Sequence, residues 1–553
     1  MEGNSSQFQN NRTVTINGGS LTSTNHTIGT LLNGGGFLVV NGGGTMTTSA
    51  NVTLGDVSGS FGTATVSGAG SSWNIGGSAV IGASGNNGVG TLSILDQSLV
   101  YVGTALSINS FSTVTLNGGT LRFNTVSGLN RLTYTSGTIQ LAGGRDVGVD
   151  ATITTLYGAF PNLPTGKGLT VEGTATLTKP LTITGGAFKT TSLAVGAGGS
   201  LNFDHGVLEL AGGSLTGLAN LVVPANGEFR ASGAATTRIT AAAGSTITAT
   251  GDLTLGNAAL ANGFYSNGDV VMGANTVTLA DANDAVLDSA AFVTLGNGGS
   301  PGTLAAANGL TLNFGGNITG FGTVDTLNDE AKPFINNGNL IGSSLAEPLT
   351  LTGYVKGVGT FDNVEFTGTF APGFSPAKVN LGSASYNGTL EIEIGGLTPG
   401  SSGYDQLNHI LGSAIAQLGG TLDVSLLGGF EPEAGNSFTV LTALGGVVGT
   451  FADVALPTLV PGLSWNLLYE PNGVLLTVSN AVNGDFDGDG DIDGRDFLAW
   501  QRGESPNPFS ADDLVAWKTN YGTGPLAASV AVPEPTSSLW PVALFVGIAL
   551  RRK

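Results

Sequence analysis

Six aspartates lie within twelve residues near the end of the chain, at a spacing that suits the binding of a metal ion. Counted from Asp485, a carboxylate stands at positions 1, 3, 5, 7, 9 and 12, with Gly490 at position 6 and Ile492 at position 8. Ca²⁺ takes six to eight oxygen ligands, and a glycine at position 6 permits the sharp turn of such a loop. Without a cation, these like charges would repel one another.

The spacing therefore predicts a calcium loop in which each aspartate has a part. The expected direct ligands are Asp485, Asp487 and Asp489. We expect Asp491 to bind through its backbone carbonyl, Asp493 through a water molecule, and Asp496 from the start of the following helix. The alternative is an acidic, disordered linker, in which neither the glycine nor the isoleucine position would be required.

The residues after this loop form a duplicated pattern that predicts two short helices. Asp496-Phe-Leu-Ala-Trp-Gln-Arg-Gly503 is followed by Asp513-Leu-Val-Ala-Trp-Lys-Thr-Asn-Tyr-Gly522. Only the first copy has a chelating loop before it, since residues 502–509 cannot chelate. A unit of about forty residues without cysteine is too small to fold on its core alone, so bound metal should contribute to its folding.

Residues 483–524 resemble a dockerin type I module, whose loops have Asp rather than Glu at position 12. Such modules usually contain two full loops, and the second loop is absent here. The departure leaves the first calcium site intact. The resemblance implies Ca²⁺ as the bound ion and a cohesin-like protein as a partner.

The chain ends in a sequence typical of a membrane segment. Pro533-Glu534-Pro535 is followed by the apolar run 539–550 and then by Arg551, Arg552 and Lys553. An apolar run next to basic residues predicts a membrane segment whose basic end stays inside. The run is shorter than the about twenty residues of a full helical span.

Residues 525–553 resemble a PEP-CTERM sorting signal in their order of Pro-Glu-Pro, hydrophobic segment and basic end. The resemblance implies an exported protein whose precursor is anchored in the inner membrane. It further implies an exosortase-type enzyme that cleaves near Pro533–Pro535 and releases the protein to the cell surface or extracellular matrix.

Composition narrows the possible functions. The chain has 553 residues, 91 glycines and a net charge of −20. This negative net charge excludes nucleic acid as a partner, because a protein binds nucleic acid by neutralising its phosphates with basic side chains. The absence of cysteine excludes disulfides and thiolate chemistry. Residues 1–11, the expected disordered start, contain no signal peptide, and because the tail implies export we expect a truncated or misassigned start.

From residue 12 to residue 383 the sequence predicts a mainly β fold, a parallel β-solenoid. Short β-branched or aliphatic runs alternate with Gly and Asn turns, which indicates strands rather than helices. A Gly-Thr/Ser-Leu or Gly-Thr-Ile phrase recurs at residues 90–94, 119–123, 137–141 and 199–203. Irregular recurrence at about twenty residues indicates stacked coils that bury their apolar faces on one another.

The same stretch resembles the passenger repeats of autotransporter-type surface proteins, in phrases such as Gly68–Trp73 and Phe370–Pro376. Residues 384–480 change in character and predict a compact antiparallel β module that caps the solenoid. Their strands are longer, their aromatic residues are denser, and four prolines mark the turns, at 432, 457, 461 and 471.

The sequence contains no group of residues that predicts catalysis. Glu391 and Glu393 share one face of a strand about 7 Å apart, within the range of inverting glycosidases. Their alternation with apolar neighbours instead predicts a solvated strand face. The best candidate for a lyase-like groove is Arg145, Asp146 and Asp150, for which a loop charge pair is the preferred interpretation. The histidines are expected to be satisfied surface or turn residues: His26, His205 and His409.

These features predict an exported, non-enzymatic structural or adhesive protein of the cell surface or extracellular matrix. Its solenoid would present Thr, Ser and Asn groups to an exopolysaccharide, and its acidic loop would bind Ca²⁺. Two alternatives stay open. One is a polysaccharide-degrading enzyme delivered by its dockerin-like module, and the other is a cohesin-binding component.

Overall fold

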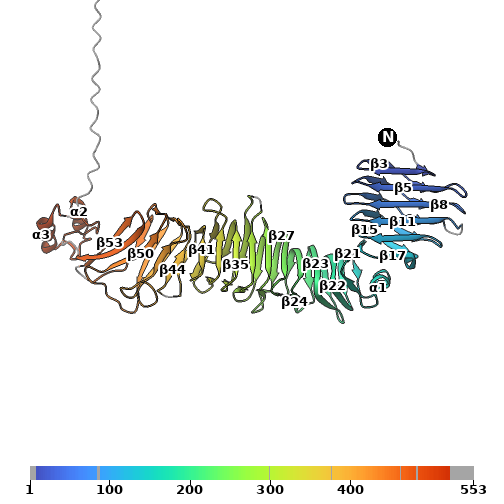
Figure 1. Cartoon of the computed structure of the whole chain (residues 1–553). Helices are drawn as coiled ribbons and strands as arrows, with labels where there is room; N and C mark the ends of the chain where they lie inside the picture. The colour runs from blue at the N-terminus through green and yellow to red at the C-terminus, as the bar shows by residue number, and fades with distance from the viewer. Residues whose placement is uncertain are drawn as a thin grey trace, which may run out of the picture. The chain divides into compact units, whose positions relative to one another are not determined.

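The structure is a computed structural model that describes residues 8–83, 87–297, 299–374, 376–460, 463–480 and 484–523. It is mainly β, and successive turns of the chain pair their strands in parallel, which agrees with the predicted solenoid (Figure 1). Two compact units are distinguished. The larger contains the β coils, and the smaller contains two helices near the C-terminal end.

The first coils have three strands each, and each strand belongs to a different sheet. The first sheet consists of β1 Phe8–Asn10, β4 His26–Ile28, β7 Val52–Leu54, β10 Ala79–Ile81, β13 Ala105–Ile108 and β16 Thr125–Ser127. The second consists of β2 Thr13–Asn17, β5 Gly35–Asn41, β8 Phe61–Ser67, β11 Val89–Leu95, β14 Thr113–Asn117 and β17 Leu132–Tyr134. The third begins with β3 Ser20–Ser23, β6 Thr45–Thr48, β9 Ser72–Ile75, β12 Leu99–Val102, β15 Thr120–Phe123 and β18 Gly137–Leu141.

The register of the second sheet gives the length of a coil. Thr13 pairs with Phe37, Phe37 with Thr63, and Thr63 with Thr91, so one coil takes 24 to 28 residues here. In a later coil, Asn220 pairs with Arg238, only 18 residues further on. The predicted repeat of about twenty residues is therefore an average over coils whose turns differ in length.

The core forms because each strand turns alternate side chains inward. In β8, Ala64 and Val66 are fully buried while Thr63 and Thr65 are partly exposed. Each Val, Leu or Ile buried in this way contributes about 1.5–3 kcal/mol. Trp73 is the largest buried side chain, and its indole N–H donates to the hydroxyl of Thr48 at 3.2 Å.

A short helical segment that the sequence did not predict interrupts the coils. The 3₁₀ helix η1 Leu129–Arg131 and β19 Arg145–Asp146 come before helix α1 Ala151–Tyr157, which is followed by β20 Asn162–Pro164. Asp150 caps α1 by accepting from the backbone N–H groups of Thr152 and Ile153 at 2.9 and 3.1 Å. This cap is the signal in the sequence that could have found the helix.

Longer strands follow α1 and extend the third sheet. They are β21 Lys167–Leu177, β22 Pro180–Val195, β23 Ser200–Thr216, β25 Gly227–Ala235 and β27 Thr246–Gly256. Bulges interrupt their register, and β27 pairs with two different strands of the next coil. One series of paired strands continues from β27 as β29 Asp269–Gly273, β32 Phe292–Leu295, β35 Asn317–Gly320, β38 Asn339–Gly342 and β41 Thr360–Asp362. The other continues as β30 Thr276–Ala280, β33 Gly302–Ala306, β36 Gly322–Thr326, β39 Leu349–Leu351, β42 Val364–Phe366, β45 Ala384–Tyr386, β48 Ala416–Leu418 and β51 Val447–Val448.

A further sheet covers another face of these later coils. Its strands are β24 Asn220–Val223, β26 Arg238–Ala241, β28 Phe264–Ser266, β31 Ala285–Leu287, β34 Leu310–Leu312, β37 Phe334–Asn336, β40 Tyr354–Gly357, β43 Thr369–Pro372, β46 Thr389–Ile394, β49 Thr421–Leu426 and β52 Asp453–Ala455. The last sheet has the order β44 Lys378–Leu381, β47 Gln406–His409, β50 Ser437–Ala443, β54 Gly473–Asn480 and β53 Leu463–Glu470.

The predicted antiparallel module at 384–480 is wrong for most of its strands. β46 pairs with β43 before it and with β49 after it, and both pairings are parallel. β49 and β52 are likewise parallel, as are β44, β47 and β50. The parallel coils therefore continue past residue 383 to residue 455. Alternation with period two marks the buried face of a strand but carries no information on the direction of its neighbour.

The expected disordered start at 1–11 is also wrong in part, because residues 8–10 form β1 and pair in parallel with β4. Within the described residues, no helix combines the length and apolarity needed to cross a membrane. The predicted hydrophobic segment 539–550 lies outside those residues.

The helical region contains α2 Gly494–Arg502 and α3 Ala511–Asn520. Asp493 caps α2 through a reciprocal capping box with Asp496, and Ser510 caps α3. Each helix contains the start of one copy of the duplicated pattern and begins two residues before it. The caps supply local start signals, which do not depend on distant contacts.

Candidate metal centre

The loop that begins at Asp485 is folded by hydrogen bonds from its own backbone to its carboxylates. Asp485 accepts from the N–H groups of Gly488 and Gly490 at 2.8 and 3.0 Å, one on each oxygen. Asp487 accepts from the N–H of Asp489 at 3.3 Å. Gly490 has φ +89°, a left-handed conformation that glycine adopts without strain. The position-6 glycine thus makes the turn that the spacing predicts.

Asp496 closes the loop from the first turn of α2. Its Oδ1 accepts from the N–H groups of Phe486 and Asp487 at 2.7 and 3.1 Å, and its Oδ2 accepts from that of Asp493 at 2.8 Å. The side chain is fully buried. A carboxylate at position 12 therefore fixes both ends of the loop, which agrees with its predicted place at the helix start.

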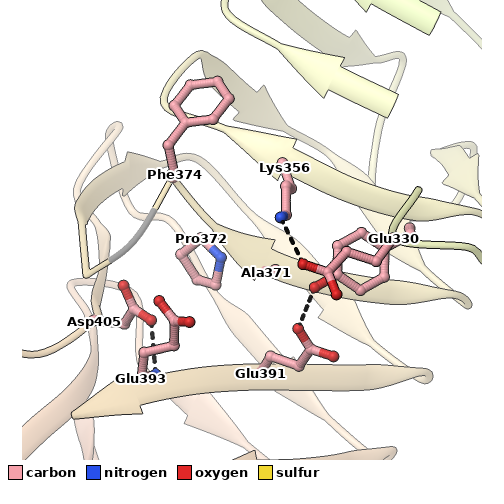
Figure 2. A pocket seen from close by; sticks show the side chains of 10 residues that line it. Glu330, Lys356, Ala371, Pro372, Phe374, Glu391, Glu393 and Asp405 are labelled. Carbon is pink, nitrogen blue, oxygen red and sulfur yellow. Dashed lines mark hydrogen bonds and ion pairs between the residues drawn. The ribbon is translucent and has the colours of Figure 1, made fainter. Parts of the chain in front are cut away.

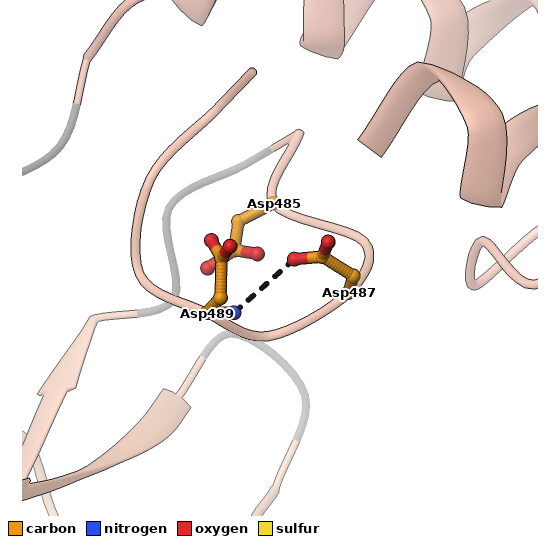
Figure 3. Close-up of side chains that lie close together, drawn as sticks. All are labelled: Asp485, Asp487 and Asp489. Atoms are coloured by element: carbon orange, nitrogen blue, oxygen red, sulfur yellow. Dashed lines mark hydrogen bonds between the residues drawn. The ribbon is translucent and has the colours of Figure 1, made fainter. Parts of the chain in front are cut away.

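The six carboxylates fall into two groups of three. One carboxylate oxygen from each of Asp485, Asp487 and Asp489 lies within 4.8 Å of the other two, and the three side chains point into the loop (Figure 3). A second group consists of Asp491, Asp493 and Asp496. The first group matches the three predicted direct ligands. In the second group, the side chain of Asp491 joins its neighbours, whereas the prediction assigned it a backbone carbonyl contact.

The donor set fits a hard divalent cation. Every atom offered is a carboxylate oxygen, the ligand type that Ca²⁺ prefers. Asp491 has one carboxylate oxygen, Oδ1, that is buried and accepts no hydrogen bond. A cation bound in the loop would give this oxygen a partner.

The electrostatics of the loop agree with this fit. Burial, together with the nearby charges of Asp496 and Asp489, raises the pKa of Asp485 to about 6, although two backbone N–H groups oppose the shift. Burial and neighbouring carboxylates also raise the pKa of Asp487. Arg495 lies 3.5 Å from Asp489, and its side chain is largely exposed. A single exposed arginine neutralises little of this charge.

A tryptophan of each helix donates a hydrogen bond to the N-terminal capping residue of the other helix. Trp500 of α2 donates its indole N–H to the backbone carbonyl of Ser510 at 3.0 Å. Trp517 of α3 donates its own to the carbonyl of Asp493 at 2.7 Å. Phe497 packs between the two indoles, with ring centroids 5.7 and 4.8 Å away. The duplicated sequence is therefore a structural duplication with reciprocal contacts.

The second copy has kept its position-12 aspartate without a metal loop. Asp513 is buried and accepts from the backbone N–H of Asn507 at 2.8 Å and from its side-chain amide at 3.3 Å. It occupies the place in α3 that Asp496 has in α2. Asn507, in a short turn, thus supplies the hydrogen bonds to Asp513. In the first copy the longer loop supplies the corresponding bonds to Asp496.

The other candidates from the sequence have structural partners. Arg145 forms an ion pair with Asp150 at 3.1 Å, as the preferred interpretation predicted. His205 is exposed beside Asp204, but His26 and His409 are buried, so the prediction of surface or turn histidines is wrong for these two. Both stand at inward positions of strands, and burial lowers the pKa of each to about 4.

Glu391 and Glu393 point outward from β46, in alternation with buried neighbours, as predicted. The face is not a simple solvated one, because both carboxylates line a pocket and the hydroxyl of Tyr354 donates to Glu391 at 2.5 Å.

The predicted sorting residues lie outside the described residues: Pro533, Glu534, Pro535, Arg551, Arg552 and Lys553. No protein-family model matches the chain, and no curated protein matches it in sequence.

Proposed function

We propose that this chain is an exported structural or adhesive protein of the cell surface or extracellular matrix, with a Ca²⁺-binding helical module at its C-terminal end. The observation that carries the proposal is the loop of Asp485–Asp496. Five of its six carboxylates accept hydrogen bonds from backbone N–H groups, and the buried Oδ1 of Asp491 accepts none. Ca²⁺ bound there would stabilise the loop and, through Asp493 and Asp496, the start of α2.

The coil architecture supports a structural role. Parallel pairing places equivalent side chains of successive coils in rows, such as Thr65, Ser93 and Thr115 on the outer face of one sheet. Neighbouring strands lie about 4.8 Å apart, so these hydroxyls form a regular array. Such an array suits an exopolysaccharide, whose hydroxyl groups recur along its chain. We propose no enzymatic activity for these coils.

The sorting route rests on the tail motif in the sequence. We propose that residues 525–553 direct an inner-membrane precursor to an exosortase-type enzyme and that cleavage near Pro533–Pro535 releases the mature protein. A cohesin-like protein is a second candidate partner, since the reciprocal contacts of Trp500 and Trp517 make a two-helix unit with two related faces.

Two measurements test these proposals. Calorimetric titration of the full chain with Ca²⁺ should show one site with a heat of binding, and chelation by EGTA should reverse it. Mass spectrometry of the mature protein from its native cells should give a C-terminus near Pro533–Pro535. The absence of calcium uptake would overturn the proposed module, and an intact Lys553 on the surface protein would overturn the sorting route.

A further inference from the structure

A pocket of about 210 Å³ opens on the outer face of the sheet that contains β40, β43 and β46 (Figure 2). Parallel register places Lys356 beside Ala371, and the next coil brings Glu391 to the other side of Ala371. The small side chain of Ala371 leaves the space that a longer residue would fill. The pocket is thus a local gap in a row of outward side chains.

One wall of the pocket carries the groups that are already paired. Lys356 forms an ion pair with Glu330 at 3.2 Å, and its ammonium lies 5.3 Å from the centroid of the Tyr354 ring. The hydroxyl of Tyr354 is committed to Glu391. The ammonium of Lys356 therefore already has a carboxylate partner, and its charge also acts on Glu391 from a distance.

The opposite wall carries acidic groups that no described basic side chain pairs with directly. Asp405 is 1% exposed and accepts from the backbone N–H groups of Ala377 and Glu393 at 2.5 and 2.7 Å. Burial raises its pKa to about 7, and burial also raises the pKa of Glu391. Within the described ranges, the ion pairs do not include Glu391, Glu393 or Asp405. This wall favours a ligand with positive charge.

The geometry favours an organic cation over a metal ion. In the part of the chain that the structure describes, three acidic groups converge within 4.8 Å only in the calcium loop, and not here. An ammonium can instead donate to carboxylates that lie further apart, because each of its N–H groups points to a separate acceptor. Phe374, 57% exposed, also lines the pocket and offers an aromatic face, which attracts both cations and the C–H face of a sugar ring.

We propose that this pocket binds a single sugar residue with a free amino group, as part of an amino-sugar polymer. The ammonium would lie between Glu391 and Glu393, and the ring would pack towards Phe374. Ligand pockets for drug-sized molecules measure about 300–1,000 Å³, so this smaller space suits one residue rather than a length of chain. The inference deepens the proposed adhesive function, on which it rests for a glycan as the ligand class.

The test is calorimetric titration of the full chain with a β-1,4-linked glucosamine hexamer and, in parallel, with the N-acetylglucosamine hexamer of the same linkage. The charged hexamer should bind at least about tenfold more tightly, because charge-assisted hydrogen bonds to the carboxylates are lost on acetylation. Equal affinity for the two hexamers would overturn the proposal, as would no binding of either.

Variants locate the site. Replacing Glu391 and Glu393 together by Gln should weaken binding about tenfold or more, and Ala371→Leu should abolish it by filling the pocket with no change in charge. Asp423→Asn is the matched control. Asp423 is the register neighbour of Glu391 on the adjacent strand of the next coil, but it does not line the pocket. An equal loss in this control would show a diffuse charge effect and contradict a built pocket.

Thermal unfolding of each variant separates loss of binding from loss of structure. The double Glu→Gln variant removes charge from the pocket, whereas Ala371→Leu fills its space. If both of these variants bind the glucosamine hexamer as tightly as the unchanged protein does, the pocket assignment fails. The proposed function is judged separately, by calcium uptake and by the mature C-terminus. Those two results do not involve this face of the coils.

Discussion

Trp517 donates its indole N–H to the backbone carbonyl of Asp493 at 2.7 Å, so helix α3 fixes the residue at which the acidic loop ends and helix α2 begins. The equivalent bond from Trp500 to Ser510 fixes the start of α3. Ile492 adds backbone bonds of 2.9 and 2.7 Å with Thr523 and Gly522. The geometry of the loop therefore depends on contacts made by the second copy of the duplicated unit.

Replacement of Trp517 by Phe should destabilise the helical module while leaving the β coils intact. The variant loses one hydrogen bond and leaves the carbonyl of Asp493 without its donor, at a cost of about 1–3 kcal/mol. Hydrogen exchange followed by mass spectrometry should show faster exchange over residues 494–520 and unchanged exchange over the coils. Unchanged exchange over both regions would contradict the assigned role of this bond.

Removal of loop carboxylates should abolish calcium binding. Asp485→Asn together with Asp487→Asn removes two of the three convergent carboxylates of the proposed site, and we expect at least about a hundredfold loss of calcium affinity in calorimetry. The matched control is Asp512→Asn, which removes an exposed acid on α3 of the same module. If the control loses as much affinity as the double variant, general electrostatic attraction accounts for the binding.

Phe366 is expected to be a critical core residue of the later coils. It is 1% exposed and stacks on Phe370 and Tyr386, with ring centroids 4.2 and 5.4 Å away. Phe366→Ala should cost about 3–5 kcal/mol in the free energy of unfolding. Phe314 is 85% exposed, so Phe314→Ala should change it by no more than about 0.5 kcal/mol. Denaturant unfolding compares the two, and equal costs would contradict this account of the core.

Asp405 should make the coils less stable as pH rises. Burial raises its pKa to about 7, whereas in an unfolded chain an aspartate titrates near 4. Between about pH 4 and pH 7 the folded state therefore holds the extra proton. The stabilising effect is complete at the low end of this window and is lost as pH rises through 7. The slope from this one group is at most about 1.4 kcal/mol per pH unit.

Comparison with Asp405→Asn isolates this effect. The variant should be less stable at pH 5, because an amide can accept only one of the two backbone hydrogen bonds from Ala377 and Glu393. The difference in unfolding free energy between the two proteins should shrink between pH 5 and pH 8. A difference that stays constant over this range would rule out Asp405 as the titrating group.

Features that depend on local spacing can be read from the sequence alone. The spacing of the aspartates in the loop 485–496, with Gly490 at the turn, predicted where carboxylates converge. The duplicated pattern at Asp496 and Asp513 predicted the two helices α2 and α3. Period-two alternation and recurrent phrases predicted mainly parallel strands for residues 12–383. These signals can be read because each acts within a few residues of the chain.

The pairing of particular strands, and the direction of pairing after residue 383, follow from the tertiary structure. It extended the parallel coils to residue 455 and buried His26 and His409. It also brought Lys356 to one pocket with Glu391 and Asp405, which share a coil further along the chain. Alternation shows which side chains turn inward, yet neither the partner strand nor its register is encoded in that alternation. Those follow from the lengths of the intervening turns, which vary from coil to coil, and from how the buried side chains pack together.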